Sequence, residues 1–133
     1  MKDRWIQVTP SEFPWEQAAL RFVKDGLPDH EPYRAWANFE FIEGGAIGEV
    51  DLFVISPKGL FLVEIKSWPG TIRGDQGTWW KTKPGDTREH PLDNPVIVTN
   101  RKAKRLKSLL GRQPIFRGER VPFMGLLTFP WVV

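Results

Sequence analysis

Two carboxylates and an amine stand in apolar surroundings near the middle of the chain. Asp51 begins the apolar segment 51–56, and Glu64 and Lys66 end a second apolar segment, 60–66. Paired carboxylates can hold a hard divalent cation such as Mg²⁺ or Mn²⁺, and a nearby ammonium group can stabilise negative charge on a bound phosphate. These residue types allow metal-assisted hydrolysis if the fold brings them together.

The turn between the two segments determines which residues face each other. Residues 56–59 read SPKG, and proline and glycine occupy positions that favour a reverse turn. The sequence therefore predicts a β-hairpin in which Asp51 faces Glu64, and Glu49 faces Lys66.

Side chains alternate between the two faces of a strand, so this hairpin predicts one apolar face and one mixed face. The apolar face is expected to contain Val50, Leu52, Val54, Phe61, Val63 and Ile65. The other face is expected to gather the ionisable groups at its open end, with Glu49 as an ion-pair partner of Lys66.

Directly opposed carboxylates repel each other. Facing Cβ atoms lie roughly 4.5 to 5.5 Å apart, and Coulomb's law at about 5 Å with an effective dielectric near 20 gives on the order of 3 kcal/mol of repulsion. A shared proton, the ammonium of Lys66 or a bound Mg²⁺ or Mn²⁺ would each offset it. The pattern E-x-K also occurs on edge strands that use charge against aggregation, so spacing alone leaves a structural explanation open.

Helices are predicted on both sides of the hairpin in the sequence. The first is expected to begin after Ser11 as its cap and to end at Gly26. Its predicted apolar side consists of Trp15, Ala18, Ala19, Phe22 and Val23. The second is expected from Asn94 as cap and Pro95 in the first turn to Gly111, with Val96, Ala103, Leu106 and Leu110 on its apolar side.

Further strands are predicted from alternating or apolar runs. One begins at Tyr33 and ends at the glycine pair 44–45, and another covers residues 121–133. The segment 67–93 is expected to hold short strands, in GTIRG and GTWWK, inside a long excursion. This order predicts an α/β fold, an α+β sandwich with a mixed central β-sheet flanked by helices.

Length and composition limit the class of protein. The 133 residues suit a single domain, 1–133, and a strand that runs to Val133 suggests the N-terminal part of a longer protein. The absence of cysteine excludes disulfide and thiolate-metal chemistry. Since no apolar run approaches the length of a membrane span, a soluble cytoplasmic protein without membrane contact is expected.

Positive charge is concentrated in residues 101–120. This segment holds eight Lys and Arg residues and only one acidic residue, Glu119, although the whole chain has a net charge of +3. Such a segment indicates a polyanionic partner, and it is also compatible with a solvated helix face.

The hairpin residues resemble the D-(x)n-E-x-K core of the PD-(D/E)xK nuclease superfamily, and more narrowly the nuclease-related domain called NERD. The similar residues are GEVD at 48–51 and VEIKS at 63–67, with Gly70 following. The resemblance extends to a glutamate in the first helix, to the Gly- and Trp-containing segment 70–80, and to the Asn-Pro start of the basic helix. It implies a restriction-endonuclease-like fold.

The resemblance also implies roles for particular residues. Asp51 and Glu64 would hold Mg²⁺ or Mn²⁺ with the backbone carbonyl of Ile65, Lys66 would position water or steady the phosphate, and Glu16 would complete the acidic cluster. DNA phosphates would contact Arg101, Lys102, Lys104, Arg105 and Lys107.

Within the NERD group, SEFPWEQAAL and NRKAKRLKSLL are similar to the N-terminal domain of serine/threonine kinases from the phage-growth-limitation and BREX defence systems. Other phage-defence proteins are therefore expected among its partners. Many NERD domains have a glutamine where this chain has Val98. A metal-dependent DNA nuclease, a non-cleaving module that regulates an attached kinase, and a purely structural interaction domain thus remain as alternatives.

Overall fold

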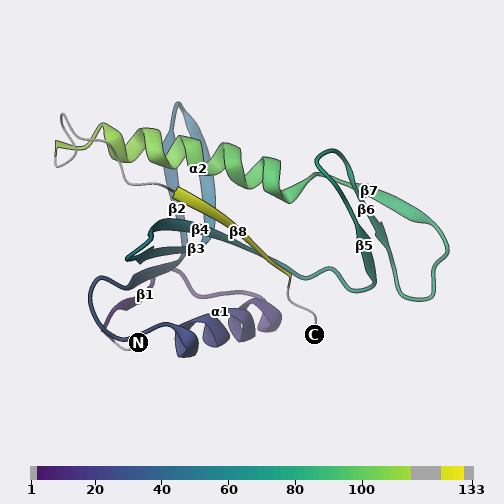
Figure 1. The fold of residues 1–133 in the computed structure, drawn as a ribbon, viewed down its shortest axis with the longest axis horizontal. Coiled ribbons are helices and arrows are strands. Elements are labelled where there is room, and N and C mark those ends of the chain that lie inside the picture. The colour runs from purple at the N-terminus through teal and green to yellow at the C-terminus, as the bar shows by residue number, and fades with distance from the viewer. Residues whose placement is uncertain (1–2, 115–123, 131–133) are drawn as a thin grey trace.

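The protein consists of two helices and two β-sheets (Figure 1). The computed structural model describes residues 3–114 and 124–130. The strands are β1 (Trp5–Gln7), β2 (Arg34–Glu43), β3 (Ala46–Ser56), β4 (Gly59–Lys66), β5 (Thr71–Arg73), β6 (Trp79–Thr82), β7 (Glu89–Leu92) and β8 (Met124–Pro130). The helices are α1 (Pro14–Gly26) and α2 (Pro95–Gly111).

The central sheet has the strand order β1-β2-β3-β4-β8. Strands β2, β3 and β4 are antiparallel neighbours, whereas β1 runs parallel to β2 and β8 runs parallel to β4. Helix α1 packs on one face through Ala19 and Leu20, and α2 packs on the other through Ala103 and Leu106 (Figure 1). The predicted sandwich of helices around a mixed sheet is confirmed.

Helix α1 begins later than its sequence suggests. Its N-cap is Phe13, which makes no side-chain capping bond, and Pro14 stands in the first turn, so the expected cap at Ser11 is wrong. Residues at helical spacing turn toward the sheet, namely Glu16, Ala19, Leu20 and the half-buried Val23. Ala18 and Phe22, expected on that side, are exposed.

Helix α2 begins and ends where its residues indicate. The side chain of Asn94 accepts a hydrogen bond from the backbone N–H of Val96 at 3.0 Å, and Pro95 follows in the first turn. Thr99, Ala103 and Leu106 are buried against the sheet. Val96, expected on the apolar side, is 48% exposed, because the buried row of α2 runs through Pro95, Thr99, Ala103 and Leu106 and Val96 lies beside it.

The β3–β4 hairpin has the predicted register. Facing pairs run from Ser56↔Gly59 at the turn to Leu52↔Val63, after which the ladder ends. Gly59 has φ 126°, a conformation that suits glycine at the end of this turn. Continuing the register places Asp51 opposite Glu64, beyond the last paired residues.

Val50 does not share a face with Leu52 and Val54 as predicted, because side-chain alternation changes at Asp51. Val50 packs with Phe41 and Phe53 on the α2 side, whereas Leu52 packs on the α1 side. On the neighbouring strand Asn38 has φ 58°, and the pairs Ala37↔Leu52 and Phe39↔Val50 flank the unpaired position Asn38/Asp51. The left-handed backbone at Asn38 therefore shifts the alternation of both strands by one residue.

The second sheet has the order β5-β6-β7 and is antiparallel throughout (Figure 1). The short strands expected in GTIRG and GTWWK are β5 and β6. Strands β7 and β1 were not predicted, because β7 contains Pro91 and β1 has only three residues. Trp79 donates its ring N–H to the carbonyl of Asp75 at 2.9 Å and lies against Gly74, so it fixes the β5–β6 loop to the start of β6.

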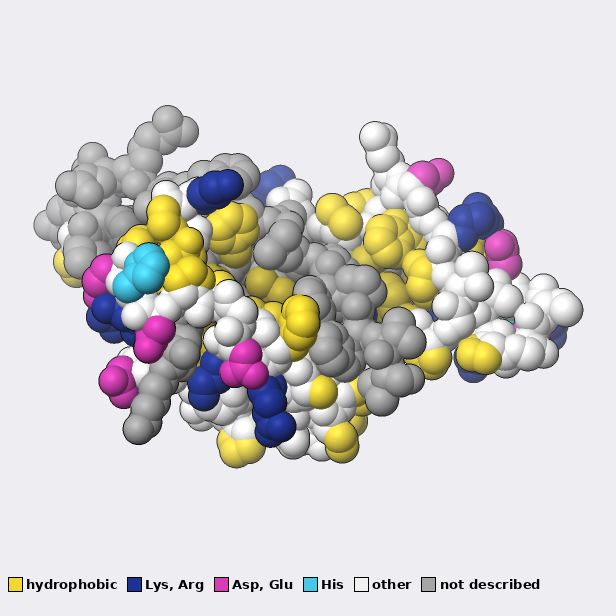
Figure 2. Space-filling view, turned by 60° about the horizontal axis from the view of Figure 1, so that its bottom comes forward, with side chains coloured by type: hydrophobic (Ala, Val, Ile, Leu, Met, Phe, Trp, Pro, Cys, Tyr) yellow, Lys and Arg dark blue, Asp and Glu magenta, His cyan; other side chains and the backbone are white. Residues whose placement is uncertain are grey.

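The predicted terminal strand is β8, which covers Met124–Pro130. Residues 121–123 and 131–133 of that prediction lie outside the described residues. Neither α1 nor α2, the helices of the described ranges, is long and apolar enough to cross a membrane. Figure 2 shows a face on which acidic and basic side chains of the described residues are interspersed with apolar ones.

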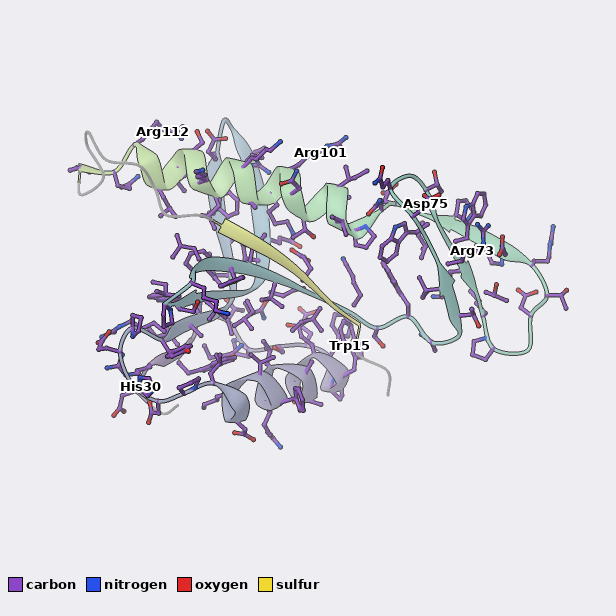
Figure 3. The ribbon with its side chains drawn as sticks, in the orientation of Figure 1. Trp15, His30, Arg73, Asp75, Arg101 and Arg112 are labelled. Carbon is purple, nitrogen blue, oxygen red and sulfur yellow. The ribbon has the colours of Figure 1, made fainter. Side chains whose placement is uncertain are left out.

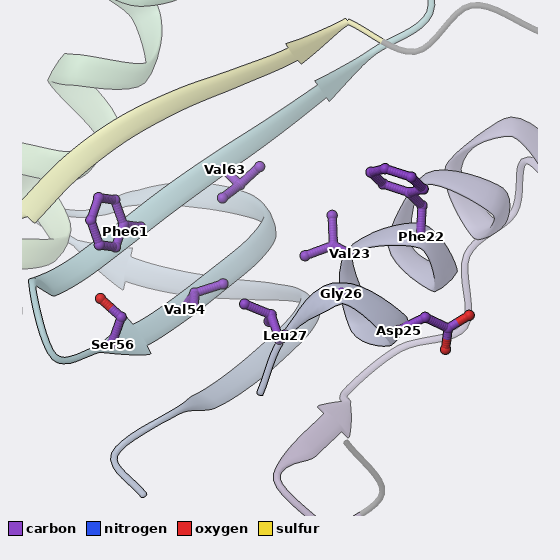
Figure 4. A pocket seen from close by; sticks show the side chains of 9 residues that line it. All are labelled: Phe22, Val23, Asp25, Gly26, Leu27, Val54, Ser56, Phe61 and Val63. Atoms are coloured by element: carbon purple, nitrogen blue, oxygen red, sulfur yellow. The ribbon is translucent and has the colours of Figure 1, made fainter. Parts of the chain in front are cut away.

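An apolar pocket of about 670 Å³ lies between the second half of α1 and the turn end of the hairpin (Figure 4). Its lining includes Val23, Leu27, Val54, Phe61 and one acidic residue, Asp25. It has no pair of carboxylates among the lining side chains that the structure describes. The carboxylate pair expected from the sequence lies elsewhere, at the open end of the hairpin.

Candidate active site

Asp51 lies in the gap that opens where β3 departs from β4. Its Oδ2 accepts a hydrogen bond from the backbone N–H of Ile65 at 2.8 Å, so the carboxylate takes the place of a strand carbonyl in satisfying this amide. Val50 and Leu52 on either side of it pack on opposite faces of the sheet. Asp51 is therefore directed toward β4, between the two layers.

Glu64 is a buried carboxylate with two cationic neighbours. The residue is 4% exposed, and its Oε1 lies 2.6 Å from Nζ of Lys102, while its Oε2 lies 3.9 Å from Nζ of Lys66. Burial raises the pKa of Glu64, and the negative charge of Asp51 raises it further, whereas Lys102 and Lys66 act in the opposite direction. The hairpin register, which continues to Asp51 opposite Glu64, explains why the charge of Asp51 acts on Glu64.

Lys66 joins this group rather than its expected partner. Its ion pair within the described residues is with Glu64. Glu49, the predicted partner, faces Glu40 across β2 and β3 and lines a different pocket. The reason is the change of alternation at Asp51, which carries Glu49 to the face opposite Glu64.

Glu16 approaches Asp51 from the α1 layer. It is 9% exposed and lies in the row of α1 residues that faces the sheet. Burial raises its pKa, and the charges of Asp51 and Glu12 raise the pKa further. Glu16 and Asp51 share a pocket of about 560 Å³ with Glu12, Glu40 and Glu49.

The carboxylates do not form one compact cluster. Within the part of the chain that the structure describes, no three Asp, Glu, His or Cys side chains come together in a group that could hold a metal ion. Glu16 and Glu64 lie on opposite sides of Asp51, in separate pockets. The predicted acidic trio is thus arranged as two pairs that share Asp51.

Lys102 lines the Glu64 pocket, although the sequence grouped it with the DNA-contacting cations of the basic helix. A pocket of about 180 Å³ is lined by Glu64, Lys66, Trp68, Leu92, Asp93, Pro95, Val98, Thr99 and Lys102. Lys102 follows buried Thr99 by three residues and precedes buried Leu106 by four, so it occupies a core-facing position of α2. This spacing from Thr99 and Leu106 is the sequence signal that could have shown that Lys102 faces the core.

The other basic residues of α2 divide into two groups. Arg101, Lys104 and Lys107 are exposed and form no ion pair within the described ranges. Arg101 projects from the outer side of α2 (Figure 3). Arg105 instead donates to the backbone carbonyls of Ala46 at 2.7 Å and Glu43 at 3.2 Å, so it fastens α2 to the β2–β3 turn.

The donor set fits a hard divalent cation that retains water. Mg²⁺ is commonly bound through one or two carboxylates together with waters and substrate phosphate. Asp51 and Glu64 supply two carboxylates, and Oδ1 of Asp51 accepts no hydrogen bond from the described residues. No histidine or cysteine lies among the described residues that line the pocket, which favours Mg²⁺ or Mn²⁺ over softer ions.

The α+β sandwich, with a carboxylate pair and a lysine at the open end of a hairpin, is consistent with a nuclease-like domain. Residues 11–130 match the family model described as NERD, nuclease-related domain. The chain belongs to this family.

One curated relative is the "Probable kinase PglW" of Streptomyces coelicolor. The chain is 44% identical to it over 124 residues, which cover 90% of this chain and 8% of that protein. The chain therefore spans only a small part of the length of this relative. No solved structure matches the chain.

Proposed function

We propose that this chain is a metal-dependent DNA phosphodiester hydrolase, and that it serves as the nuclease-related domain of a bacterial phage-defence protein with an attached serine/threonine kinase. The observation that supports it best is the buried Glu64, whose pKa is raised by burial and by Asp51 while Lys66 lies 3.9 Å away. Perturbed carboxylates next to a lysine in a pocket are typical of catalytic sites. The kinase part rests on the printed name of the Streptomyces relative.

Asp51 and Glu64 would hold Mg²⁺ or Mn²⁺, with the Ile65 carbonyl as a further ligand. When bound, such an ion polarises a phosphodiester and lowers the pKa of a coordinated water. The hydrogen bond from the Ile65 N–H fixes Asp51 against β4, so the carboxylate is held in place before any ligand arrives. Preorganisation of this kind reduces the cost of binding.

Lys66 would orient the attacking water or steady negative charge on the phosphate. Its side chain is 34% exposed, so the amine is accessible from solvent while it remains beside Glu64. Glu16 would act through Asp51, because the two carboxylates share a pocket and the charge of Asp51 raises the pKa of Glu16. Its contribution is to keep the Asp51 side chain in an acidic environment that attracts cations.

The exposed cations of α2 would bind DNA phosphates. Arg101, Lys104 and Lys107 are free for such contacts, which provide affinity without sequence information. Arg105, predicted for the same role, is engaged by the β2–β3 turn. Lys102, also predicted, points into the pocket, where the phosphate to be cleaved would lie.

A plasmid-nicking assay tests the hydrolase. Wild type should nick supercoiled DNA with Mg²⁺ or Mn²⁺ and not with EDTA, and Glu64→Gln and Lys66→Met should each lose at least about a hundredfold in rate. Lys58→Met is the matched control, because Lys58 is exposed at the other end of the same hairpin. Metal-dependent nicking that survives both site variants would reject the assignment.

A non-cleaving module that regulates an attached kinase is the second candidate. Val98 favours it, because an apolar side chain that is 41% exposed lines the Glu64 pocket where many NERD domains have a glutamine. It predicts DNA binding without cleavage in any divalent metal. Any cleavage by wild type that Glu64→Gln abolishes would exclude it.

DNA binding itself is tested by neutralising the exposed cations of α2. The triple variant Arg101→Gln, Lys104→Gln, Lys107→Gln should reduce the slope of log affinity against log salt by about two to three, roughly 0.9 for each lost phosphate contact. The matched control, Arg21→Gln, Lys24→Gln, Lys58→Gln, removes the same charge from the opposite layer and the hairpin turn. Equal slopes for the two triples would show that α2 does not contact the phosphates.

A further inference from the structure

We propose that Lys102 binds the phosphate in the active site. Its ammonium group forms an ion pair with Glu64 until a divalent cation displaces it. The inference rests on the proposed function and assigns Lys102 a role at the reacting phosphate. It differs from a role on the outer surface of α2, where the exposed basic residues lie.

The contact between Lys102 and Glu64 is direct and shielded. Nζ lies 2.6 Å from Oε1, and the two side chains are 18% and 6% exposed. Charge-assisted hydrogen bonds of this length are strong, and water competes little with a pair that is mostly buried. The ammonium group of Lys102 is therefore the nearest counter-charge to Glu64 among the described residues.

The same contact obstructs a metal ion. A magnesium ion binds carboxylate oxygens at about 2.0 to 2.1 Å. The ammonium nitrogen stands 2.6 Å from Oε1 and thus occupies the space next to this oxygen that a cation would take. Binding through Oε1 therefore requires the Lys102 side chain to swing away.

Helix packing keeps the displaced amine close to the site. Ala103 and Leu106 are 4% and 5% exposed in the core between α2 and the sheet, so the helix cannot rotate to turn Lys102 outward. Thr99, one turn earlier, is 1% exposed and shares the pocket with Lys102. A displaced Lys102 side chain therefore stays at the pocket that its helix position faces.

The net charge around the pocket would match one bound anion when a divalent cation is present. The lining holds two carboxylates, Glu64 and Asp93, and two amines, Lys66 and Lys102, with Asp51 adjacent. These five groups carry one net negative charge in their ionised forms. Adding a divalent cation leaves one net positive charge, which matches a single phosphodiester, and Lys102 is the amine released to bind it.

Calorimetry with Mn²⁺ alone tests the displacement. Lys102→Met keeps the apolar stem and removes the charge, so it should bind Mn²⁺ at least tenfold more tightly than wild type in mildly alkaline buffer. Lys102→Gln is a second variant in case the first fails to fold, and thermal melting checks both. Lys58→Gln, exposed at the hairpin turn, is the control and should bind Mn²⁺ as wild type does.

Fluorescence anisotropy with a labelled DNA duplex tests the phosphate contact. With Ca²⁺ in place of Mg²⁺, Lys102→Met should bind DNA at least fivefold more weakly than wild type, although it binds metal more tightly. Tighter metal binding together with weaker DNA binding separates a phosphate-binding role from a structural one, since a damaged pocket would weaken the binding of metal and of DNA alike. Unchanged or weaker Mn²⁺ binding, or unchanged DNA binding, overturns the proposal.

The result also distinguishes this inference from the proposed function. Equal Mn²⁺ binding by wild type and by both Lys102 variants, with metal-dependent nicking intact, would reject the role of Lys102 and leave the hydrolase standing. Absence of Mn²⁺ binding by wild type and variants alike would reject both the metal-dependent hydrolase and the role of Lys102. Binding by the variants alone would support the displacement of Lys102.

Discussion

Asp51 combines a structural and a chemical role at a single residue. Its carboxylate satisfies the Ile65 amide at the place where the ladder between β3 and β4 ends. It also lies close enough to Glu16 and Glu64 to raise the pKa of both. Replacing Asp51 therefore has two opposite effects on stability: loss of the hydrogen bond destabilises the fold, and loss of the repulsion stabilises it.

Two substitutions at Asp51 separate these effects. Asp51→Asn retains an oxygen that accepts the Ile65 N–H and relieves repulsion, so its free energy of unfolding should equal or exceed that of wild type. Asp51→Ala leaves the amide without its partner and should cost about 1 to 3 kcal/mol. Urea denaturation measures both, and equal stability of the two variants would contradict the role of this hydrogen bond.

Glu16 makes the stability of the fold depend on pH. Burial raises its pKa above the ordinary value of 4.5, and the unfolded chain gives up the proton first as pH rises. The free energy of unfolding should therefore fall as pH increases from 4.5 through the higher pKa of the folded state. Below 4.5 both states hold the proton, and Glu16 contributes no pH dependence there.

Glu16→Gln should remove this part of the pH dependence. Thermal melts across the acidic range should show a smaller loss of stability with rising pH than in wild type. Part of the loss should remain, because the pKa of Glu64 is raised in the same direction. Asp25→Asn, exposed at the other end of α1, is the control, and identical profiles for Glu16→Gln and wild type would refute the assignment.

At the scale of elements, Asn94 connects α2 to the second sheet. Its Oδ1 caps the helix at the Val96 N–H, and its Nδ2 lies 2.9 Å from the carbonyl of Gly77 and 3.3 Å from those of Asp75 and Gln76. The residue is 7% exposed and uses both ends of its amide. One side chain thus begins α2 and fixes the β5–β6 loop against the start of this helix.

Asn94→Asp tests this double role. Aspartate caps helices as well as asparagine does, so a pure capping role predicts little change. Since the carboxylate would face three backbone carbonyls without a donor, we expect Asn94→Asp to lose about 1 to 3 kcal/mol in urea denaturation. Asn94→Ala should lose a similar amount, and a stable Asn94→Asp variant would show that the loop contacts contribute little.

At the scale of the whole molecule, one sheet separates two apolar layers. Leu52 is completely buried on the α1 side and Leu62 is completely buried on the α2 side. They come from adjacent strands of the same hairpin. Each layer therefore depends on the strands that also form the other.

Cavity-forming substitutions test this coupling. Leu52→Ala and Leu62→Ala should each lower the free energy of unfolding by about 2 to 5 kcal/mol. Both variants should still unfold in a single transition, because neither layer persists without the shared sheet. Different transition midpoints by tryptophan fluorescence and by circular dichroism would show instead that the layers unfold separately.

Features that depend on neighbouring residues could be predicted from the sequence. Asn94, Pro95 and Gly111 indicated both ends of α2, and the SPKG turn indicated the register of β3 and β4. The D…E-x-K spacing identified the carboxylates that lie next to each other. Caps and turns act between residues a few positions apart, so their information is contained in short segments of chain.

Tertiary structure alone decided which charged side chains enter the site. Glu16 and Lys102 occupy core-facing helix positions, but whether such a side chain is solvated or paired depends on the element packed against it, as Lys102 meets Glu64 on β4. The change of alternation at Asp51 arises from the backbone of Asn38 on another strand. The sequence by itself determined the helices, the hairpin and the chemical groups; packing between distant segments determined which of those groups meet.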